Sequence, residues 1–372
     1  MTFDCLHVCL VGPLPPPAGG MANQTRQLAE LLTVEGARVD IVQVNAPYSP
    51  AWAGRIKGLR AVFRLVPYLY RLWRAAGRAD VMHVMANSGW SWHLYAMPAI
   101  RLAAMRRTPI VVNYRGGEAG TFLETAANSV RASMKRASSL ILPSGFLLDV
   151  FARYGMVGRI VPNIIDVDRF SPAETSGKGE GGFSIIVTRN LEAIYGIDVV
   201  IKAFALVIEQ LPDAHLAIAG SGPLCGALET LAKDLGIEKR VEFTGRLDRD
   251  QVAALYRDAH LSVNPSHVDN MPNSVLESMA SGVPVISTRV GGVPFIVEDG
   301  QTALLVPPND PVAMARAIVR VGQDSVLADR LRNAARDEVQ RYRWAAVKHE
   351  LLSAYEDAMR SPADDIVRPL RD

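Results

Sequence analysis

The chain is poor in cysteine, which limits the chemistry that it can carry. Only three cysteines occur in 372 residues, and Cys5, Cys9 and Cys225 have neither a metal-ligand spacing nor the spacing of a disulfide framework. Such cysteine usage fits a reducing compartment. The seven histidines also lack paired ligand spacing. We therefore expect no metal site, no disulfide framework and no cofactor.

Several catalytic and targeting motifs are also missing. There is no nucleotide-triphosphate loop ending in Gly-Lys-Ser/Thr, and no nucleophile elbow with a Ser/His/Asp or Cys/His set. No uncharged stretch reaches the roughly 18–20 residues that span a bilayer. The N-terminus lacks a basic segment followed by a long apolar one, so we expect no signal peptide and a cytoplasmic location.

Charge is nearly balanced overall but uneven along the chain. The net charge of +2 gives no support for nucleic-acid binding, and we expect no nucleic-acid partner. The segment Arg55–Arg78 carries seven basic residues and no acidic one, interleaved with aromatic and aliphatic residues. Such a helix is typical of contact with an anionic membrane surface, so we predict peripheral attachment to the inner face of the plasma membrane. The alternative is an ordinary surface helix with one buried face; in either case Pro67 should kink or split it.

Short apolar runs alternate with helical spacing along most of the chain. This alternation predicts parallel sheets covered on both faces, with a ligand in the cleft between two halves. A stretch rich in Gly, Ser, Glu and Lys at Pro172–Gly182 separates the halves. We predict an α/β chain with domains at 1–171 and 183–342 and a helical tail, 343–372, that packs back on the first. The expected strands are Leu6–Val11, Val39–Val44, Val81–Met85, Ile110–Val112, Leu140–Leu142, Ile160–Val161, Ser184–Val187, His215–Ala219, Val241–Phe243, Leu261–Val263, Val285–Ser287 and Ala303–Val306.

Two carboxylates, Asp269 and Glu277, bracket an apolar turn that contains Pro272. The pattern predicts a strand, a loop, a short helix and a strand, with Pro272 in the first helical turn and Asn273 as a cap or first-turn residue. Free N–H groups at a helix start suit phosphates, whereas carboxylates accept hydrogen bonds from hydroxyls. The pattern therefore predicts a ligand with both groups. His267 is the histidine expected to line this site.

Two glycine-rich loops follow predicted strands. Gly19 and Gly20 come just before a helix, where paired glycines let backbone amides approach a ligand. Gly220 and Gly222 lie in a second loop, which resembles a dinucleotide fingerprint but lacks its third glycine and its acidic residue. For both loops the alternative is a turn that needs glycine for structure alone. The incomplete fingerprint gives little support to a nicotinamide oxidoreductase.

An arginine follows a strand in each half. Arg189 ends the first strand of the second half, where a guanidinium suits a diphosphate; the alternative is a salt bridge on the cleft rim. In the first half Asn113, Arg115 and Glu118 follow an apolar strand. Arg115 is expected to contact phosphate or sugar. Glu118 is expected to hold Arg115 or to bind acceptor hydroxyls, and each residue has a structural alternative.

Together these features resemble the retaining glycosyltransferases of family 4, which have the GT-B fold of two Rossmann-like domains facing across a cleft. The resemblance covers nearly the whole chain and is densest over Leu261–Asp310. The residues that carry it are Asn264-Pro265-Ser266, Pro272-Asn273, Leu276-Glu277-Ser278-Met279-Ala280-Ser281-Gly282-Val283-Pro284-Val285-Ile286, Gly291-Gly292, Gly19-Gly20, Ala219-Gly220-Ser221-Gly222-Pro223, and Pro162-Asn163-Ile164-Ile165-Asp166 with Phe170.

The resemblance implies a nucleotide-sugar donor bound mainly by the second domain. Glu277 matches the glutamate that holds the ribose hydroxyls, Arg189 matches the diphosphate arginine, and Asp269 stands where a carboxylate binds donor-sugar hydroxyls. The implied catalytic residues are Arg189, Asp269, Glu277 and Arg115, and the implied acceptor residues are Asn113, Arg115 and Glu118. The implied donor-binding residues are Gly19, Gly20, Arg189, Asn190, Gly220, Gly222, Gly245, Arg246, Leu247, Asp269, Asn270, Met271, Pro272, Asn273, Ser274, Val275 and Glu277.

Three positions depart from the family pattern. Asp269 replaces the usual glutamate and is shorter by one methylene. Tyr195, just before Gly196, stands where the family usually has a lysine, which removes one positive charge from the phosphate site. Arg115 stands where a histidine often precedes the glycine, and we expect it to restore that charge from the facing domain.

The implied function is metal-independent hexosyl transfer with retention of anomeric configuration. The donor would be a UDP- or GDP-linked sugar, which is a substrate rather than a cofactor. The acceptor would be a glycan or lipid-linked acceptor in the synthesis of bacterial lipopolysaccharide, exopolysaccharide or glycolipid. Arg189 and the amides before Glu277 would stabilise the leaving diphosphate, and the departing phosphate would act as base. The alternative is a catalytically degenerate nucleotide- or sugar-binding subunit of a glycan assembly complex.

Overall fold

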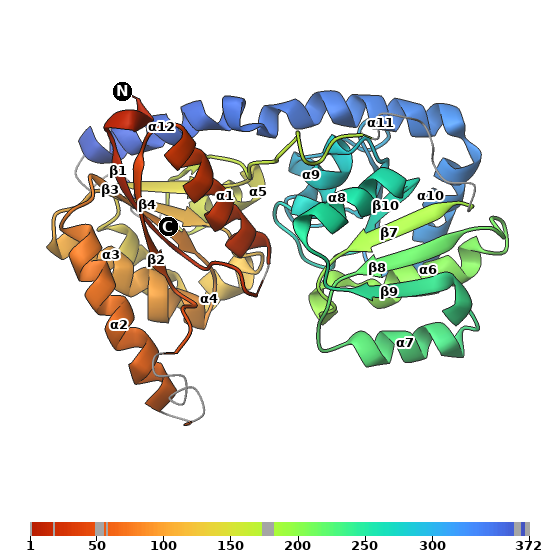
Figure 1. Ribbon diagram of the computed structural model, residues 1–372, viewed down its shortest axis with the longest axis horizontal. Coiled ribbons are helices and arrows are strands. Elements are labelled where there is room, and N and C mark those ends of the chain that lie inside the picture. Colours follow the sequence, from red (N-terminus) through yellow and green to blue (C-terminus); the bar gives the residue numbers. More distant parts are fainter. Residues whose placement is uncertain are drawn as a thin grey trace. The chain divides into compact units, whose positions relative to one another are not determined.

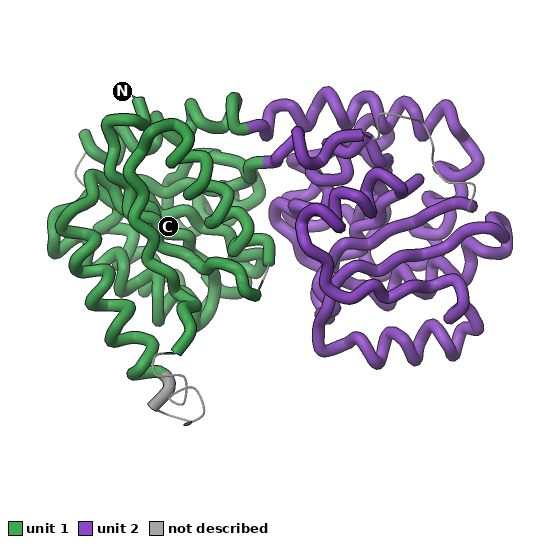
Figure 2. The backbone as a smooth tube through the Cα atoms, viewed as in Figure 1, with its two compact units in different colours: residues 1–164, 344–372 green, residues 165–343 purple. Residues whose placement is uncertain are grey.

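The computed structural model describes residues 2–17, 19–48, 56, 59–172, 182–360 and 366–368. The chain forms two compact units, shown in Figure 2. Met1–Ile164 and Trp344–Asp372 make up the first unit, and Ile165–Arg343 the second. Most of the predicted linker at Pro172–Gly182, and the first residues of the predicted membrane segment, lie outside the described residues.

The described part of the first unit contains one parallel sheet flanked by helices (Figure 1). Its strands are β1 (His7–Gly12), β2 (Arg38–Gln43), β3 (Val81–Ala86), β4 (Ile110–Tyr114), β5 (Ser139–Leu142) and β6 (Arg159–Ile160). Its main helices are α1 (Gly20–Val34), α2 (Leu59–Ala76), α3 (Met97–Met105), α4 (Ala119–Met134), α5 (Gly145–Arg153) and α12 (Trp344–Arg360). The strand order is β2-β1-β3-β4-β5-β6. β3, β4 and β5 are buried throughout, as expected for central strands covered on both faces.

Helix α12 belongs to the first unit although it lies near the end of the chain. Its buried residues recur at helical spacing: Val347, Leu351, Ala354, Tyr355 and Ala358. They share one apolar cluster with Val8 of β1 and Val111 of β4. Tyr355 Oη also lies 2.8 Å from Nδ1 of His83 on β3. The tail therefore packs on the first unit through Trp344–Arg360, as the sequence predicted.

The second unit repeats this plan. Its strands are β7 (Ser184–Thr188), β8 (His215–Ala219), β9 (Val241–Gly245), β10 (Leu261–Asn264), β11 (Val285–Thr288) and β12 (Leu304–Val306). Its main helices are α6 (Ile197–Val207), α7 (Cys225–Asp234), α8 (Arg249–Asp258), α9 (Asn273–Ala280), α10 (Pro311–Gln323) and α11 (Ser325–Val339). The parallel order β12-β11-β10-β7-β8-β9 is that of doubly wound folds. β7 and β10 flank the switch point, where such folds bind ligands beyond the carboxyl ends of the strands.

The boundary between the units differs from the predicted domain boundary. The sequence predicts a first domain that ends at residue 171, whereas residues 165–171 belong to the second unit. Phe170 is buried there, with its ring centroid 6.0 Å from that of Tyr256 on α8, and Arg169 forms an ion pair with Asp250. These contacts tie the segment to the second core. The predicted cleft between the domains stays a prediction.

Helix α2 runs continuously from Leu59 to Ala76 with Pro67 inside it, so Pro67 does not split the helix. The helix packs on β2 and α3, and its buried residues include Tyr68 and Leu72. Within the described parts of the chain, no helix has both the length and the apolar character needed to cross a membrane.

Candidate active site

Arg189 lies at the switch point of the second sheet, directly after β7. Its Nε donates a hydrogen bond of 2.8 Å to Oδ1 of Asn264, the last residue of β10. Its guanidinium also forms an ion pair with Asp269, and the two side chains are only 12% and 11% exposed. Asn264 is held in turn by Ser287, to which its Nδ2 donates at 2.9 Å. Arg189 is thus held by both Asn264 and Asp269. The sequence analysis named a salt bridge as the alternative role of Arg189, and the partner in that salt bridge is Asp269, which is itself a predicted site residue.

The loop that carries Asp269 is fixed by its own hydrogen bonds. Asp269 Oδ1 accepts from the backbone N–H of Asn270 at 3.0 Å, and the Asp269 carbonyl accepts from the N–H of Gly292 at 3.1 Å. Met271 is buried in the apolar core of the unit, so its side chain contributes packing rather than ligand contacts. The loop therefore holds one carboxylate beside Arg189.

Helix α9 begins directly after this loop. Pro272 is the N-cap residue in an extended conformation, and Asn273 is the first helical residue, so the prediction that Pro272 lies in the first turn is wrong by one position. Pro272 has no side chain that could cap the first turn. The Ser274 hydroxyl is buried and has no hydrogen-bond partner among the described residues. An uncapped helix N-terminus with a buried hydroxyl is suited to receive an anionic group.

Glu277 lies one turn into α9 and is surrounded by protein. Burial raises its pKa from 4.5 to about 7, opposed mainly by the positive charge of Arg249. Tyr256 Oη on α8 lies 3.4 Å from Glu277 Oε2, 3.1 Å from Ser274 O and 2.5 Å from Thr188 Oγ1. Tyr256 thereby links the end of β7 to α9. Sequence reasoning missed both Tyr256 and Arg249, because a tyrosine at helical spacing has the pattern of an ordinary core residue.

Tyr195 stands at the position of the expected lysine and contacts Arg189. Its ring centroid lies 5.0 Å from Arg189 Cζ, which is cation–π geometry. Gly196 follows with φ of 59°, and a side chain there would meet the carbonyl of Pro265. His267 packs against the same glycine and has a buried Nδ1 without a hydrogen-bond partner among the described residues. His267 therefore lies next to the Tyr195 turn, on the loop that leads to Asp269.

The glycine loop after β8 packs against the backbone that follows β7. A Cβ on Gly220 would lie 1.8 Å from the carbonyl oxygen of Arg189, and one on Gly222 would lie 2.3 Å from that of Leu191. Packing alone therefore requires both glycines, which supports the structural alternative for this loop. Their predicted contact with the donor stays a prediction.

The remaining predicted donor residues of the second unit lie around the same edge of the sheet. Gly245 ends β9 with φ of 70° and accepts from the N–H of Gly220 at 2.8 Å. Arg246 Nε donates to Ser221 Oγ at 3.2 Å, and Leu247 follows in the loop. Asn190 Nδ2 donates to Glu192 Oε1 at 3.2 Å. These residues surround the crevice without contacting Asp269 or Glu277 through any described hydrogen bond.

In the first unit, Gly19 and Gly20 lie at the start of α1. Gly19 is the N-cap residue in extended conformation and Gly20 is the first helical residue. A Cβ on Gly19 would meet no atom within 4 Å among those described. Packing therefore does not explain Gly19, in contrast to Gly220.

Arg115 belongs to a chain of buried polar groups in the first unit. Its Nε donates to Asn113 Oδ1 at 3.1 Å, and its Nη1 donates to Asn163 Oδ1. The Asn113 amide donates to His83 Nε2 at 3.0 Å, so His83 carries its proton on Nδ1 and donates to Tyr355. Burial lowers the pKa of His83 to about 3 and that of Arg115 to about 10.

Glu118 does not hold Arg115 as the sequence allowed. The arginine is bound by two asparagines instead, and the Glu118 carboxylate makes no hydrogen bond or ion pair with any described residue. Its exposed carboxylate remains a predicted contact for the acceptor. Within the described parts of the chain, no cluster of His, Cys, Asp and Glu side chains has the arrangement of a metal site.

Two family models adjoin along the chain. The model described as "Glycosyltransferase Family 4" matches residues 18–169, and the model described as "Glycosyl transferases group 1" matches residues 169–338. The chain belongs to the group 1 glycosyltransferases. The second match contains the whole Arg189–Asp269–Glu277 crevice, and the first contains Arg115.

Individual relatives and solved structures agree with this assignment. A D-inositol 3-phosphate glycosyltransferase from Corynebacterium glutamicum is 34% identical over 175 residues, which are 45% of this chain and 42% of that protein. One from Acidothermus cellulolyticus is 30% identical over 217 residues, which are 54% of this chain and 48% of that protein. The matches thus span about half the length of these relatives.

The fold is shared over nearly the whole chain. A sucrose-phosphate synthase from Thermosynechococcus elongatus superposes with a TM-score of 0.78 at 22% identity and covers 95% of this chain and 99% of its own. Anabaena HepE, solved with UDP and glucose, gives 0.73 at 17% identity, with 94% and 99% covered. The predicted GT-B fold is confirmed, since two parallel α/β units match these glycosyltransferase structures.

Proposed function

We propose that this chain transfers a sugar from a nucleoside diphosphate sugar to an acceptor hydroxyl. The observation that carries the proposal is the crevice at the switch point of the second sheet. There Arg189 and Asp269 form an ion pair beside the uncapped start of α9, and Glu277 lies one turn further along the helix. The site therefore offers Arg189, helix amides and two carboxylates, with Arg249 near Glu277, which suit a diphosphate joined to two sugars.

The proposed roles follow from the charge that develops during the reaction. The sugar–oxygen bond breaks toward the diphosphate, so negative charge grows on the leaving group, and Arg189 with the α9 amides stabilises it without a metal. Glu277 accepts hydrogen bonds from the ribose hydroxyls, and Asp269 from hydroxyls of the transferred sugar. The acceptor attacks on the face of the leaving group, with the departing phosphate as base, so anomeric configuration is retained.

To bind the donor, Arg189 has to give up some of its contacts with Asp269 and make contacts with the diphosphate. With Asp269 as its counter-ion it is pre-positioned, and Asn264 prevents its guanidinium from rotating away. An incoming diphosphate then competes with Asp269 for the same N–H groups, which frees the carboxylate to accept from sugar hydroxyls. Binding of the donor and release of Asp269 are thus coupled in this proposal.

The acceptor is proposed to bind the first unit near Arg115, Asn113 and Glu118. Arg115 is held by Asn113 and Asn163, and the exposed Glu118 follows in the next turn. A glycan or lipid-linked acceptor in surface polysaccharide or glycolipid synthesis fits a carboxylate that accepts hydroxyls and a cation that contacts phosphate. The names of the curated relatives add D-inositol 3-phosphate as an acceptor to test.

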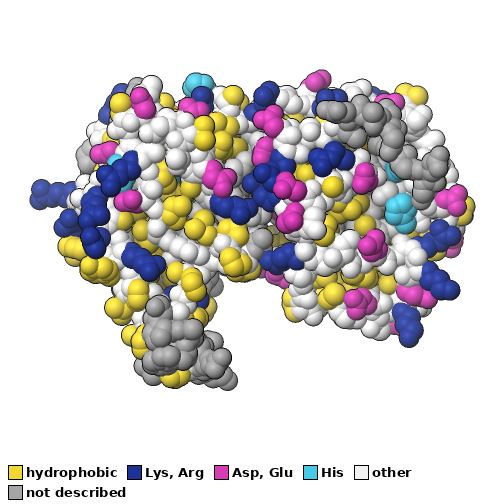
Figure 3. Space-filling model, in the orientation of Figure 1, with side chains coloured by type: hydrophobic (Ala, Val, Ile, Leu, Met, Phe, Trp, Pro, Cys, Tyr) yellow, Lys and Arg dark blue, Asp and Glu magenta, His cyan; other side chains and the backbone are white. Residues whose placement is uncertain are grey.

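Membrane attachment is proposed through the exposed face of α2. Val62, Val66, Leu69, Tyr70 and Trp73 are 37–60% exposed and recur at helical spacing. Hydrophobic side chains gather over this helix in Figure 3, at lower left. No acidic residue occurs between Ile41 and Ala79. An apolar stripe in an entirely basic segment suits the anionic inner leaflet, where basic residues and buried apolar area act together.

A second candidate function is a nucleotide-binding subunit without turnover. It is favoured by the position of Tyr195, which leaves Arg189 as the cation of the crevice at the place where relatives have two, and by the ion pair that occupies Asp269. The two candidates differ in turnover and agree in binding.

The test is a thermal-shift screen of the purified chain against nucleoside diphosphates and their sugars, followed by a transfer assay with every ligand that binds. A ligand that binds only the folded state raises the melting temperature. We expect stabilisation by UDP or GDP and transfer from the matching sugar. Stabilisation without transfer to any glycan, lipid extract or inositol phosphate would favour the second candidate, and no stabilisation by any nucleotide would contradict both.

A further inference from the structure

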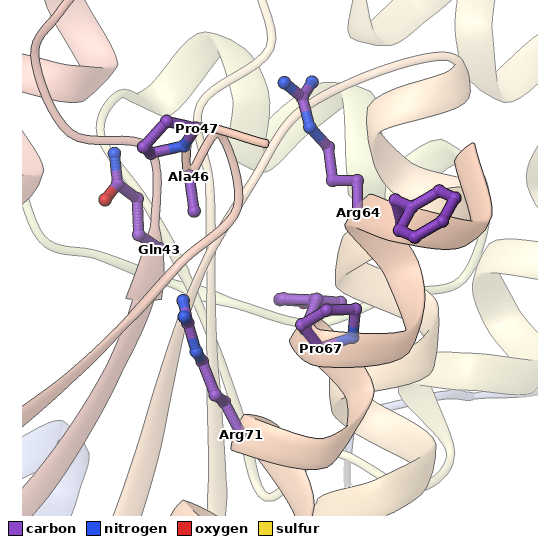
Figure 4. Close-up of a pocket in the computed structure, with 8 residues that line it drawn as sticks. Gln43, Ala46, Pro47, Arg64, Pro67 and Arg71 are labelled. Atoms are coloured by element: carbon purple, nitrogen blue, oxygen red, sulfur yellow. The ribbon is translucent and has the colours of Figure 1, made fainter. Parts of the chain in front are cut away.

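The first unit has a pocket of its own, formed by residues other than those of the site described above. It is bordered by the end of β2 and by one side of α2, and is lined by Gln43, Ala46, Pro47, Phe63, Arg64, Pro67, Tyr68 and Arg71. Figure 4 shows Gln43 on the β2 side and Arg64 and Arg71 on the helix. Arg64 and Arg71 are seven residues apart, so they lie on the same side of α2, two turns from each other.

Neither arginine side chain has a counter-ion among the described residues. The Arg71 side chain makes no hydrogen bond or ion pair with any of them. Arg64 Cζ stacks over the ring of Tyr48 at 4.2 Å, but its Nε is buried and has no hydrogen-bond partner among the described residues. The sequence from Ile41 to Ala79 contains no acidic residue, so the segment has none that could pair with them. A buried guanidinium N–H without an acceptor is costly, and a bound anion would remove that cost.

The polar and apolar parts of the pocket define the ligand further. Gln43 Nε2 donates once, to Asn45 Oδ1 at 3.1 Å, and keeps a second N–H. Two guanidinium groups and an amide match a phosphate, which carries a charge near −2 and several acceptor oxygens, better than a carboxylate. The remaining wall is apolar, formed by Phe63, Pro67 and the ring of Tyr68, whose hydroxyl is already bonded to the carbonyl of Tyr95. An inorganic phosphate would leave that wall in contact with water.

We propose that Gln43, Arg64 and Arg71 form a binding site for the phosphate group of an organic phosphate ester. The phosphate accepts from the two guanidinium groups, and the organic part lies on Phe63 and Pro67. Gln43 ends β2, so the pocket lies at the carboxyl edge of the first sheet, the edge at which Arg115 follows β4. On the proposed function, on which this last step rests, the ester is the acceptor's phosphate.

The test measures binding to the full chain and needs no turnover, so it can fail independently of sugar transfer. Phenyl phosphate is the free ester, titrated by calorimetry. Phosphatidylcholine vesicles with and without phosphatidic acid supply the lipid headgroup, and binding is read by co-sedimentation. The variants are Arg64→Gln and Arg71→Gln, and the control is Arg101→Gln, which removes the same charge from the exposed side of α3, outside both the pocket and the basic segment Arg55–Arg78.

We expect each pocket variant to weaken binding of at least one probe by about tenfold or more, and the control to leave it unchanged. Loss of phenyl phosphate binding identifies a free ester, and loss confined to phosphatidic acid vesicles identifies a lipid headgroup; each supports the site. Since Arg64 stacks on Tyr48, the exposed Arg71 provides the variant that leaves packing intact, and melting curves confirm its fold. Absence of binding by the unmodified chain, or equal weakening by Arg101→Gln, would overturn the proposal.

Discussion

Arg189 and Asp269 form an ion pair at the carboxyl edge of the second sheet, with both side chains nearly removed from water. The two residues are eighty positions apart in sequence and meet because β7 and β10 are neighbours. The carboxylate at this position is one methylene shorter than the family's glutamate, and it still reaches the guanidinium. The pair therefore joins the predicted phosphate-binding residue to the predicted sugar-binding residue before any donor arrives.

Replacing Asp269 by Asn is expected to affect stability, nucleotide binding and sugar transfer in three different ways. The unfolding free energy should fall by roughly 3–5 kcal/mol, because Arg189 keeps its charge in a nearly buried place without a counter-ion. Affinity for the nucleoside diphosphate should be unchanged or higher, since the phosphate no longer competes for Arg189. Transfer should fall by about tenfold or more, because a charged acceptor of sugar hydroxyls is lost. Denaturation, calorimetry and initial rates measure the three quantities.

The control for this variant is Asp198→Asn. Asp198 pairs with Lys202 on the surface of α6, where the side chains are 44% and 47% exposed, and such pairs contribute little. We expect no measurable change in transfer. A loss of nucleotide affinity in Asp269→Asn would contradict the competition between phosphate and carboxylate.

Glu277 should make stability depend on pH. Burial raises its pKa from 4.5 to about 7, so between these values the folded state holds a proton that the unfolded chain releases. The stabilisation is therefore complete below about pH 4.5 and is lost as pH rises through 7, a change of roughly 2–3 kcal/mol. Glu277→Gln cannot ionise. Its unfolding free energy relative to the unmodified chain should rise by that amount between pH 5 and pH 8, as measured by urea denaturation. A difference that stays constant with pH would show that Glu277 does not titrate in this range.

The same ionisation should appear in donor binding. Ribose hydroxyls donate to an ionised carboxylate more strongly than to a neutral acid. Donor affinity should therefore increase from pH 6 to pH 8 in the unmodified chain and remain flat in Glu277→Gln. Calorimetric titration with the donor at several pH values provides the comparison. Parallel pH profiles in the two proteins would place the ribose elsewhere.

Tyr195→Lys should restore the second cation of the family's phosphate site. The ring of Tyr195 now stacks on Arg189, so the substitution replaces a cation–π contact with a positive charge beside the diphosphate position. Affinity for UDP or GDP should rise by roughly tenfold and become more sensitive to salt. Tyr195→Phe retains the ring and should leave affinity unchanged. Weaker binding in Tyr195→Lys would mean that the stacked tyrosine itself holds Arg189 in its binding geometry.

Arg115→Ala should abolish transfer and leave a folded protein. Arg115 is bound to Asn113 and Asn163, at the end of a polar chain that reaches Tyr355 on α12. Arg115→Lys keeps the charge but cannot bind both asparagines with one planar group, so it should recover only part of the activity. Near-normal transfer by Arg115→Ala, with a circular dichroism spectrum like that of the unmodified chain, would remove Arg115 from the mechanism.

Membrane attachment through α2 should depend on its apolar stripe. Val66→Asp places a negative charge on a valine that is 59% exposed, and binding to anionic vesicles should weaken by about tenfold or more. The control is Val326→Asp on α11, where the valine is 77% exposed. Sedimentation at low salt measures both. Equal retention of the two variants on vesicles, or no binding of the unmodified chain, would contradict attachment by α2.

The strands could be predicted to within two residues because central parallel strands are continuous apolar runs bounded by turn residues. The boundary between the units could not be predicted, because it depends on the core against which Phe170 packs. The sequence does not show which core an apolar loop residue joins. Pro67 was expected to kink or split α2; the helix continues through Pro67, and Tyr68 and Leu72, which follow it, are buried.

The sequence predicts which residues form the site, but it does not predict which of these residues contact one another. The spacing of Asp269 and Glu277 around a helix start predicts a ligand site there, because helix amides and carboxylates act locally. Three contacts join segments far apart in sequence: the ion pair of Asp269 with Arg189, the hydrogen bond that Arg115 donates to Asn163, and the contact of Tyr256 with Glu277. Such pairings follow from strand order, which a single sequence does not contain. Glu118 was predicted as a partner of Arg115 because it lies only three positions away in sequence.

The most direct measurement of the central claim is release of nucleoside diphosphate from UDP- or GDP-sugars, with and without membrane lipid extract, by the unmodified chain and by Arg189→Ala. The account predicts acceptor-dependent release by the unmodified chain, lower by about a hundredfold or more in Arg189→Ala, because the leaving diphosphate loses its cation. Equal release by both proteins, or no release from any donor that binds, would contradict a transferase built on the Arg189–Asp269 crevice.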